Sequence, residues 1–425
     1  MIFVYYLSLF FYQITIYSFS FAVRISALWN SKHKLWVEGC LNIHERIREA
    51  IKPGEKRIWI HCSSLGEFEQ GRPVIEQIKK QYPGYAIFIT FFSPSGYEIR
   101  KDYALADYVF YLPADTIKNA QNFVEIVDPK LVIFVKYEFW YNYFKSIRKH
   151  NIPFILISAI FRKDKVFFKP WGILFRKMLG KIDHIFVQDE RSKELLAGIN
   201  FKNVSVAHDT RIDRVLQISN EAWKSDLQEV EEFCGNQHIL IAGSSYATEE
   251  EFISKLIQNP EFEWKVIIAP HNIEKSHINT IKGVFGESAV FWSDIKSADK
   301  KTELENYRIL VIDTIGLLAH LYKYASVALI GGGFGKSIHN ILEPATFGLP
   351  VMIGPNNHEK FREATDLLDL GGAFIVKNYK EFETRMLTFK DDNTRETAGS
   401  TSRKYIMDHS GGTRVVMDWI AGAGF

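Results

Sequence analysis

Short apolar runs recur along most of the chain, and they constrain its fold more than any other feature. Each run is rich in β-branched and aromatic residues, and an amphipathic, charged segment separates it from the next. Runs this apolar indicate strands buried on both faces, and therefore parallel sheets wound by crossover helices. The predicted strands are 57–62, 85–91, 108–112, 131–136, 154–158, 184–188 and 204–207, then 238–242, 265–269, 309–312, 327–330, 351–353 and 373–376.

The strands fall into two groups, which predicts two α/β domains. A chain of 425 residues suggests two or three domains. The stretch 214–236 holds no predicted strand and is rich in Glu and Gln, so we interpret it as the linker. The predicted domains are 37–213 and 237–400, and a helix within 401–425 is expected to return to the first. Ligands of open α/β sheets bind at the carboxyl ends of the strands, so we expect those ends of the two sheets to face one cleft.

The first 24 residues form a separate segment. The first charged side chain is Arg24, and nine of the first 23 residues are Phe or Tyr. A helix of this length spans about 34 Å, enough to cross a hydrocarbon core of about 30 Å. A cleaved signal peptide would have a basic start and a small-residue cleavage site, and neither is visible. A buried core helix is the other alternative to the membrane anchor that we predict here. Because Lys and Arg follow the segment, the remaining chain is expected in the cytoplasm.

Composition narrows the function classes. The net charge of +2 gives no whole-chain case for binding nucleic acid. The three cysteines lie far apart, without a CxxC pattern or a Cys/His cluster, so we expect reduced thiols and no structural zinc.

A turn of small residues follows the first predicted strand and leads into an amphipathic helix. The sequence from His61 to Arg72 reads HCSSLGEFEQGR. Small residues in such a turn let the backbone approach a ligand, and Glu67 could act there as a general base on a hydroxyl. The alternative is that Glu67 complements the dipole of its own helix as an ordinary first-turn acid.

A glycine cluster follows the predicted strand 327–330. It reads GGGFGKSIHNILEPA from Gly331 to Ala345, and a helix is expected from Asn340. A glycine-rich loop that feeds a helix is suited to hold a phosphate. The pattern is neither GxxxxGK[ST] nor GxGxxG, which weakens ATP-loop and dinucleotide interpretations. Glu343 could bind ribose hydroxyls or cap its own helix.

Two further turns of the second half are candidate ligand contacts. The sequence from Ala242 to Ser245 again places small residues at the end of a predicted strand. Pro270 and His271 end the next strand, where a side chain could touch a base or a phosphate, although a lone His is more often a surface residue.

Taken together, these segments resemble one family, the Kdo (3-deoxy-D-manno-octulosonic acid) transferases of lipopolysaccharide synthesis. The most specific parts are Gly66-Glu67 and the glycine block with His339-Asn340 and Leu342-Glu343-Pro344. The resemblance covers nearly the whole chain and implies a GT-B glycosyltransferase with two Rossmann-like domains. It implies that CMP-Kdo is the donor, bound by the second domain. The implied acceptor is the lipid A disaccharide precursor, lipid IVA, bound by the first domain at the cytoplasmic face of the inner membrane.

The resemblance also implies roles for single residues. Glu67 matches the general base of the family, and Glu138 matches a second acid associated with stabilising the transition state. Arg211 stands where the family commonly has a Lys with a similar part. The implied donor contacts are Ser244, Pro270, His271, Ile315, Gly316, Leu317, Gly332, Gly333, Asn340, Ile341, Leu342 and Glu343. Two positions depart from the family, because an Arg is more usual at His271 and an acid is expected at Leu317.

The chemistry of the implied reaction agrees with these residues. CMP leaves from a carbon that can carry oxocarbenium character, and backbone amides with an Arg can stabilise the departing phosphate without a metal. No convincing DxD-like pattern occurs, so we predict a metal-independent transfer with no cofactor. The alternatives are a GT-B enzyme that uses another nucleotide sugar, such as a UDP-sugar transferase or epimerase, and a membrane-tethered scaffold without activity.

A basic, aromatic stretch bears on the acceptor. Residues 161–181 contain seven basic residues, one acid and five aromatics. Such a surface suits an anionic membrane interface or a phosphorylated glycolipid, and we expect Arg162, Lys163 and Lys165 to contact one of them. The alternative is a solvated helix face whose apolar side packs into the core.

Overall fold

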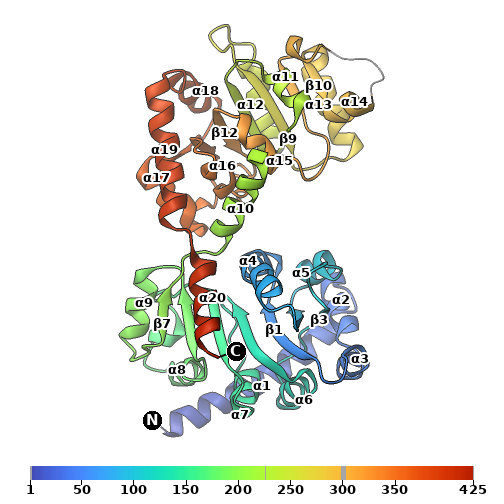
Figure 1. Cartoon of the computed structure of the whole chain (residues 1–425), viewed down its shortest axis with the longest axis vertical. Helices are drawn as coiled ribbons and strands as arrows, with labels where there is room; N and C mark the ends of the chain where they lie inside the picture. Colours follow the sequence, from blue (N-terminus) through green and yellow to red (C-terminus); the bar gives the residue numbers. More distant parts are fainter. Residues whose placement is uncertain (1, 225, 298–302, 425) are drawn as a thin grey trace. The chain divides into compact units, whose positions relative to one another are not determined.

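The chain folds into two compact units. The computed structural model describes residues 2–224, 226–297 and 303–424, so the predicted segments 1–24, 214–236 and 401–425 each include one residue outside the description. Unit 1 comprises Met1–Arg214 and Ser410–Phe425, and unit 2 comprises Val215–His409 (Figure 1).

Unit 1 is built on a seven-stranded sheet in the order β3-β2-β1-β4-β5-β6-β7. All neighbouring strands are parallel, as predicted from their apolar runs. The strands are β1 (Lys56–Cys62), β2 (Tyr85–Phe91), β3 (Tyr108–Tyr111), β4 (Pro129–Val135), β5 (Phe154–Ala159), β6 (His184–Val187) and β7 (Val204–Val206).

Unit 2 repeats this plan with the strand order β10-β11-β9-β8-β12-β13-β14, again parallel throughout. The strands are β8 (Ile239–Ser245), β9 (Lys265–Pro270), β10 (Ala289–Phe291), β11 (Ile309–Val311), β12 (Val327–Ile330), β13 (Val351–Ile353) and β14 (Ala373–Ile375). The thirteen predicted strands are confirmed within two residues at their ends, except that β8 continues three residues beyond its predicted end at residue 242. The sequence missed β10, because three residues between two helices give no readable period.

Helices cover both faces of each sheet. In unit 1 they are α1 (Ile2–Ser26), α2 (Ser31–Gly39), α3 (Ile43–Ala50), α4 (Leu65–Gln81), α5 (Pro94–Arg100), α6 (Ile117–Val127), α7 (Tyr141–Lys149), α8 (Ile173–Leu179), α9 (Glu190–Ala197) and α20 (Gly412–Gly422). In unit 2 they are α11 (Gln228–Cys234), α12 (Ala247–Leu256), α13 (Lys275–Phe285), α14 (Trp292–Ser297), α15 (Leu318–Leu321), α16 (Leu342–Thr346), α17 (Arg362–Leu370), α18 (Tyr379–Thr388) and α19 (Asp392–Asp408).

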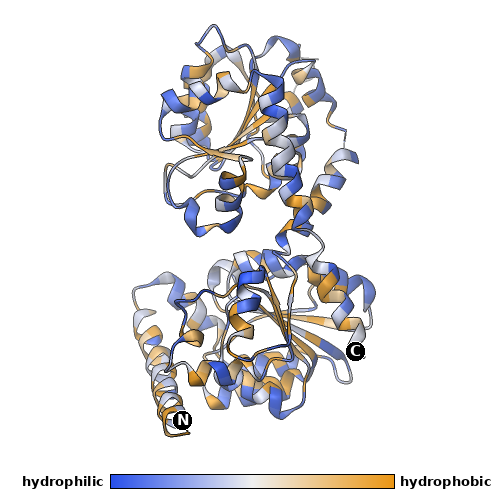
Figure 2. Ribbon diagram, turned by 90° about the vertical axis from the view of Figure 1, so that its left-hand side faces the viewer, coloured by the Kyte–Doolittle hydropathy of each residue, from blue (hydrophilic) through white to orange (hydrophobic). Residues whose placement is uncertain are grey.

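The core of unit 1 lies on both faces of its sheet. Neighbouring residues of one strand belong to different clusters: Trp59 packs in one, and Ile58 and Ile60 pack in the other. Figure 2 shows the same pattern as hydrophobic strands at the centre of each unit. Burial on both faces is the reason that the strands read as continuous apolar runs rather than as alternating ones.

The segment predicted as a linker is helical. Helix α10 (Arg211–Lys224) begins in unit 1 and continues into unit 2, where α11 follows it. The end of the chain lies with unit 1. Met417 and Ile420 of α20 pack in its core, and Asp213 accepts hydrogen bonds of 2.6 Å from the amides of both Gly411 and Thr413.

Helix α1 is long and apolar enough to cross a membrane by length and composition, but only 6% of its most apolar window is buried. The alternative of a buried core helix is therefore wrong. The helix lies on the outside of unit 1, beside α7 and α8 (Figure 1).

Candidate functional site

Each sheet has a point where the strand order reverses. In unit 1 this point lies between β1 and β4, and in unit 2 it lies between β8 and β12. At such a point the loops leave neighbouring strands in opposite directions and open a crevice, where ligands of α/β folds bind. The four loops that follow these strands carry most of the residues that the sequence singled out, so we describe them one unit at a time.

Glu67 lies in the first turn of α4, directly after β1. The Ser64 amide donates to Glu67 Oε2 at 2.7 Å, and the Ser64 hydroxyl donates to the same oxygen at 2.5 Å. This is a capping box, so Glu67 caps the start of its own helix as well as being one of its first-turn acids. Among the hydrogen bonds of the described residues, both that reach Glu67 fall on Oε2. Capping therefore leaves the other carboxylate oxygen of this half-buried residue able to accept a proton.

Glu138 follows β4, across the reversal point from Glu67. Its Oε2 lies 3.5 Å from His61 Nε2 and accepts a hydrogen bond of 2.7 Å from Trp140 Nε1. Burial by itself would raise the pKa of Glu138. The hydrogen bond and charge of His61, with further donors on Ser63 and Trp140, outweigh burial and hold the pKa below its usual range. Glu138 is therefore held as a carboxylate.

The two acids lie around one buried thiol. Cys62 ends β1 and is fully buried. Burial raises the pKa of Cys62 well above its usual value, and the negative charges of Glu67, Glu138 and Glu69 act in the same direction. Cys62 therefore remains a neutral thiol at the ends of β1 and β4, close to these three carboxylates.

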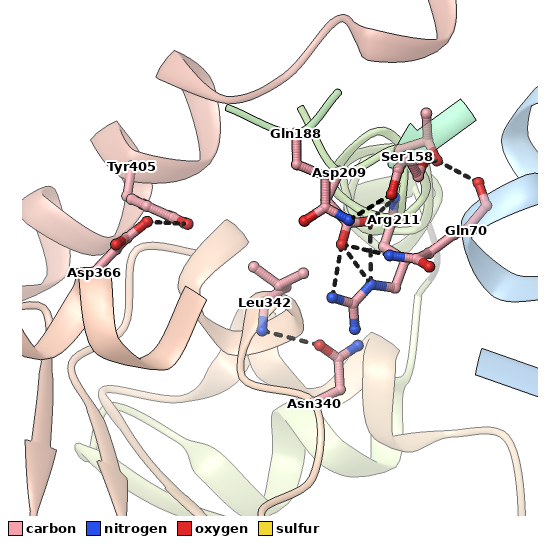
Figure 3. A network of polar contacts seen from close by, with 10 residues as sticks. Gln70, Ser158, Gln188, Asp209, Arg211, Asn340, Leu342, Asp366 and Tyr405 are labelled. Carbon is pink, nitrogen blue, oxygen red and sulfur yellow. Dashed lines mark hydrogen bonds and ion pairs between the residues drawn. The ribbon is translucent and has the colours of Figure 1, made fainter. Parts of the chain in front are cut away.

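Arg211 is already paired with a carboxylate. Its Nε lies 3.1 and 3.0 Å from the two carboxylate oxygens of Asp209, and its Nη2 donates to Oδ2 at 2.7 Å (Figure 3). Burial would raise the pKa of Asp209, but the charge and hydrogen bonds of Arg211 and a hydrogen bond of 2.9 Å from Gln70 lower it. The guanidinium position is therefore fixed by a bidentate pair.

The predicted basic stretch forms a loop followed by two short helices rather than one solvated helix face. Phe161 and Phe167 are buried in the core of unit 1, whereas Arg162, Lys163 and Lys165 are exposed. Lys165 Nζ lies 5.6 Å from the ring centre of Tyr137, the residue before Glu138. The exposed cations therefore lie at the same sheet edge as Glu138.

In unit 2 the glycine block makes close backbone contacts. A Cβ on Gly331 would lie 2.0 Å from the carbonyl oxygen of Ser244, and one on Gly333 would lie 2.5 Å from the amide nitrogen of Gly354. Gly332 has a φ of +88°. These positions require glycine because side chains would collide with backbone atoms or strain the loop. The loop thereby packs tightly against the ends of β8 and β13.

A cavity of about 600 Å³ opens beside this loop. Its lining comes from the start of α12 and from the glycine block, and consists of Tyr246, Thr248, Glu249, Gly332, Phe334, Gly335, Lys336, Ser337, Ile338 and His339. Glu249 Oε1 accepts a hydrogen bond of 2.9 Å from the amide of Gly332. Burial raises the pKa of Glu249. A protonatable acid therefore lies in the wall of the cavity, against the glycine loop.

Three aromatic side chains lie close together beside this loop. Tyr246 stacks on His271 with ring centres 4.9 Å apart, and the rings of His271 and His339 lie 4.5 Å apart. The Tyr246 hydroxyl lies 3.1 Å from His339 Nε2. Burial lowers the pKa of His339, and the neighbouring His271 lowers it further. Sequence reasoning missed Tyr246, although its place directly after the small-residue turn 242–245 was a usable signal.

The remaining predicted donor residues fall into two groups. Asn340 fixes the entry of α16 because its Oδ1 accepts from the Leu342 amide at 3.0 Å and its Nδ2 donates to Glu343 at 2.9 Å (Figure 3). Helix α16 begins at Leu342 rather than at Asn340 and ends at Thr346. The side chains of Ile341 and Leu342 are buried, so only their backbone can meet a ligand.

The second group lies at the carboxyl ends of β8 and β9 and in the turns that follow β9 and β11. Ser244 adopts a φ of +52°, Pro270 is buried, and His271 is exposed. Ile315 is 87% exposed, and it is followed by Gly316 and Leu317 in an open turn. None of the residues in this turn lines the cavity of about 600 Å³.

Metal ligands do not gather in the described part of the chain. Within residues 2–224, 226–297 and 303–424, no group of three or more His, Cys, Asp or Glu side chains could hold a metal ion.

Comparison with known proteins relates the chain to one family. Residues 41–214 match the family model described as 3-deoxy-D-manno-octulosonic-acid transferase (kdotransferase). The 3-deoxy-D-manno-octulosonic acid transferase of Aquifex aeolicus is 28% identical over 347 residues, which cover 80% of this chain and 87% of that protein.

Solved structures show the same fold at low identity. UDP-GlcNAc 2-epimerase from Neisseria meningitidis superposes with a TM-score of 0.59 at 15% identity, covering 86% of this chain and 100% of that one. MurG from Acinetobacter baumannii gives a TM-score of 0.55 at 13% identity, covering 86% and 99%. Two Rossmann-like units with such neighbours define a GT-B fold.

Proposed function

We propose that the chain moves Kdo from CMP-Kdo to the lipid A disaccharide precursor, lipid IVA. The chain belongs to the Kdo transferase family, whose members transfer Kdo in lipopolysaccharide synthesis. Glu67 is the general base, and the transfer needs neither a metal nor a cofactor. The observation that carries this proposal is the pair of acids at the reversal point of the unit 1 sheet. Glu67 and Glu138 follow β1 and β4, and both surround Cys62.

The reaction has two requirements. The acceptor hydroxyl must lose its proton as its oxygen bonds to the anomeric carbon of Kdo. The bond from that carbon to the phosphate oxygen of CMP must break, with its electron pair leaving on CMP. A base within hydrogen-bond reach of the hydroxyl and a field that stabilises the leaving phosphate supply most of the acceleration in such reactions.

Glu67 is suited to the first requirement. Its Oε2 is fixed by the amide and hydroxyl of Ser64, so the carboxylate cannot rotate away. Its other oxygen can take the proton of the acceptor hydroxyl. A capping box that holds one oxygen of a carboxylate therefore presents the second oxygen in a fixed place.

Glu138 and Arg211 serve the transition state from unit 1. Glu138 stays ionised because His61 and Trp140 hold it, so its charge can stabilise oxocarbenium character on Kdo. Arg211 can stabilise negative charge on the leaving phosphate. Its pairing with Asp209 holds the guanidinium in place and reduces its net charge. We therefore expect Arg211 to contribute less to stabilising the transition state than Glu138 does.

The donor site lies on unit 2. The cavity beside the glycine block accepts the nucleotide, with the stacked rings of Tyr246 and His271 against the base. Amides of the loop from Gly331 and of Asn340 to Glu343 face the phosphate and ribose. Neutral donors and an Arg supply what a metal ion would otherwise supply, so chelation by EDTA should leave the rate unchanged.

The acceptor meets the enzyme at a membrane. Arg162, Lys163 and Lys165 are exposed cations beside Glu138, and they bind the phosphates of the glycolipid or of the leaflet. The apolar helix α1 holds the protein at the inner membrane, and the two units work on the cytoplasmic side.

The decisive experiment is Glu67→Gln. Glutamine keeps the capping box, because Glu and Gln serve equally at that position, but it cannot accept the proton. With CMP-Kdo and lipid IVA, mass spectrometry of the glycolipid should show kcat lowered by at least about 100-fold. The melting temperature should not change. The matched control is Glu69→Gln in the same turn, which loses half-buried ion pairs to Arg72 and Arg100 but no predicted catalytic group, and should keep its turnover. Glu67→Gln enzyme with near-normal turnover would remove Glu67 from the base role.

Nucleotide protection separates this proposal from a transferase or epimerase that uses a UDP-sugar. CMP should raise the melting temperature in a concentration-dependent way, because a ligand that binds only the folded state stabilises it. UDP at the same concentration should not. Protection by UDP and not by CMP would contradict the proposed donor.

A further inference from the structure

Helix α1 contacts unit 1 along nearly its whole length through one stripe of residues. The residues of the stripe are buried or half-buried, whereas the residues between them are mostly exposed. They recur every three or four positions, with two adjacent pairs, which places them on one side of an α-helix. They are Tyr5, Ser8, Leu9, Tyr12, Gln13, Ile16, Ser20 and Val23.

Polar side chains of the stripe bond directly to the body of unit 1. The hydroxyls of Tyr5 and Tyr141 lie 2.6 Å apart, and the Tyr12 hydroxyl donates to Asp115 Oδ2 at 2.6 Å. Gln13 Nε2 donates to Asn142 Oδ1 at 2.8 Å. Asp115 is almost fully buried, so Tyr12 satisfies an acid inside the folded unit.

The opposite side of α1 is apolar and open. The exposed residues include Phe3, Phe10, Phe11, Ile14 and Phe21, and Phe10 is 59% exposed. Arg24, near the end of the helix, is its only charged residue. The helix thus leaves large apolar side chains exposed, which is unusual for a surface helix, while Tyr5, Tyr12 and Gln13 form hydrogen bonds to unit 1.

These contacts do not fit a helix that crosses a bilayer. The stripe from Tyr5 to Val23 extends over about 27 Å at 1.5 Å per residue. To cross a hydrocarbon core of about 30 Å, the helix would have to leave unit 1 or draw it into the lipid. Leaving would strip the Tyr12 donor from buried Asp115. Entry would place charged side chains of α7 and α8 in hydrocarbon, which is costly.

Cations lie beside α1 near its start, where the docked stripe meets α7 and α8. Lys177 Nζ lies 4.3 Å from the ring centre of Tyr5, and Lys181 Nζ lies 5.9 Å from that of Tyr141. Burial lowers the pKa of Lys181, and the nearby charges of Lys145, Arg148 and Lys177 lower it further. Arg148 is itself paired with Asp183 at 2.7 Å, so the three lysines supply most of the unpaired positive charge here. An apolar strip beside a basic cluster is complementary to an anionic lipid surface.

We propose that α1 lies in the plane of an anionic membrane leaflet, with its stripe docked on unit 1 and its aromatic face inserted among the lipids. Both ends of α1 are then on the same side of the membrane as the two units. The occupant of the exposed face is lipid, not a second copy of the chain. This proposal rests on the membrane localisation proposed above, but not on the reaction.

Topology of the full chain tests the orientation. An N-terminal epitope tag should resist added protease in bacterial spheroplasts and be cleaved in inverted membrane vesicles, as unit 2 should be. A tag cleaved in spheroplasts while unit 2 is protected would show a crossing helix and overturn the proposal.

Vesicle binding tests the surface. Phe10→Glu should lower co-sedimentation with vesicles containing phosphatidylglycerol at least tenfold. The matched control is Leu370→Glu in unit 2, because Leu370 is also 59% exposed, and it should bind as the unchanged protein does. Lys177→Glu should weaken binding to anionic vesicles and leave binding to purely zwitterionic vesicles unchanged. Equal binding by Phe10→Glu protein, or a wild-type protein that dimerises through α1 and binds no vesicle, would overturn the proposal.

Transfer to lipid IVA in detergent, measured on the same proteins, keeps the two proposals apart. Phe10→Glu protein should retain transfer in detergent, because no membrane is needed there. If wild-type protein binds vesicles as expected but transfers no Kdo in detergent, the proposed reaction fails and the in-plane helix stands.

Discussion

At the strand ends of unit 1 each charged candidate residue is held by at least one other side chain, whereas in unit 2 close backbone contacts shape the glycine loop beside the cavity. Glu67 is fixed by Ser64, Glu138 by His61 and Trp140, and Arg211 by Asp209. In unit 2, glycines pack against neighbouring chain segments and leave a cavity. The same fold can therefore fix reactive side chains by pairing them with other charged or polar groups, and can shape a binding site with glycines, which have no side chain.

The largest effect is expected where a buried charge loses its partner. Arg211→Met leaves Asp209 without its cation, which should lower the free energy of unfolding by about 3 kcal/mol. Thermal unfolding measures this loss. Adding Asp209→Asn to the same protein should recover most of the stability but not the transfer rate. If the double variant recovers both, Arg211 has only a structural part.

The next largest effect is expected from a side chain added to the glycine loop, which tests whether the unit 2 site depends on the close approach of its backbone segments. Gly333→Ala forces a Cβ to within 2.5 Å of the Gly354 backbone, and overpacking of this kind costs about 1–3 kcal/mol. CMP binding, measured by titration calorimetry, should weaken by about 10- to 100-fold. The control is Gly335→Ala, since the nearest atom to its Cβ would be Gly332 O at 3.5 Å. Equal loss in both variants would show that the site does not depend on this close approach.

A side-chain change in unit 2 should matter less than either of these. Tyr246→Phe keeps the ring stacked on His271 and loses only the hydroxyl contact to His339. One hydrogen bond is worth about 1 kcal/mol, so CMP affinity should fall by no more than about fivefold. Tyr379→Phe, which loses a hydroxyl bond to Glu383 elsewhere in unit 2, serves as the control in the same calorimetric titration. A loss of 100-fold in Tyr246→Phe would contradict the comparison.

The smallest expected effect is a change in protein stability that appears only at acidic pH. The pKa of Glu138 is lowered in the folded protein, so the unfolded chain takes up its proton at higher pH than the folded chain does. The stability that Glu138 contributes is present above the unfolded value of about 4.3 and is lost as pH falls through the lowered folded value. Glu138→Gln should remove this dependence. Melting temperatures of both proteins from pH 7 to pH 3 should converge in acid, and a constant difference would contradict it.

The strands could be read from the sequence because their signals are local, whereas Glu138 was found only through the family resemblance and the roles of both acids stay predictions. A strand buried on both faces leaves an apolar run, and thirteen runs were enough to predict the parallel sheets. Glu67 and Glu138 each follow such a run. The three residues of β10 carry too little pattern, and the Tyr246 ring meets His271 and His339 only because β8, β9 and β12 are neighbours in the sheet.

The N-terminal helix α1 shows most clearly what the sequence determines and what only the tertiary structure decides. Its sequence determined a long apolar helix without charge before Arg24, because composition and length alone decide whether a helix suits lipid. Which side of that helix faces protein was decided by the tertiary structure. Tyr12 reaches Asp115 across 103 positions of sequence, and a hydrogen bond between distant residues exists only once the sheet has brought them together.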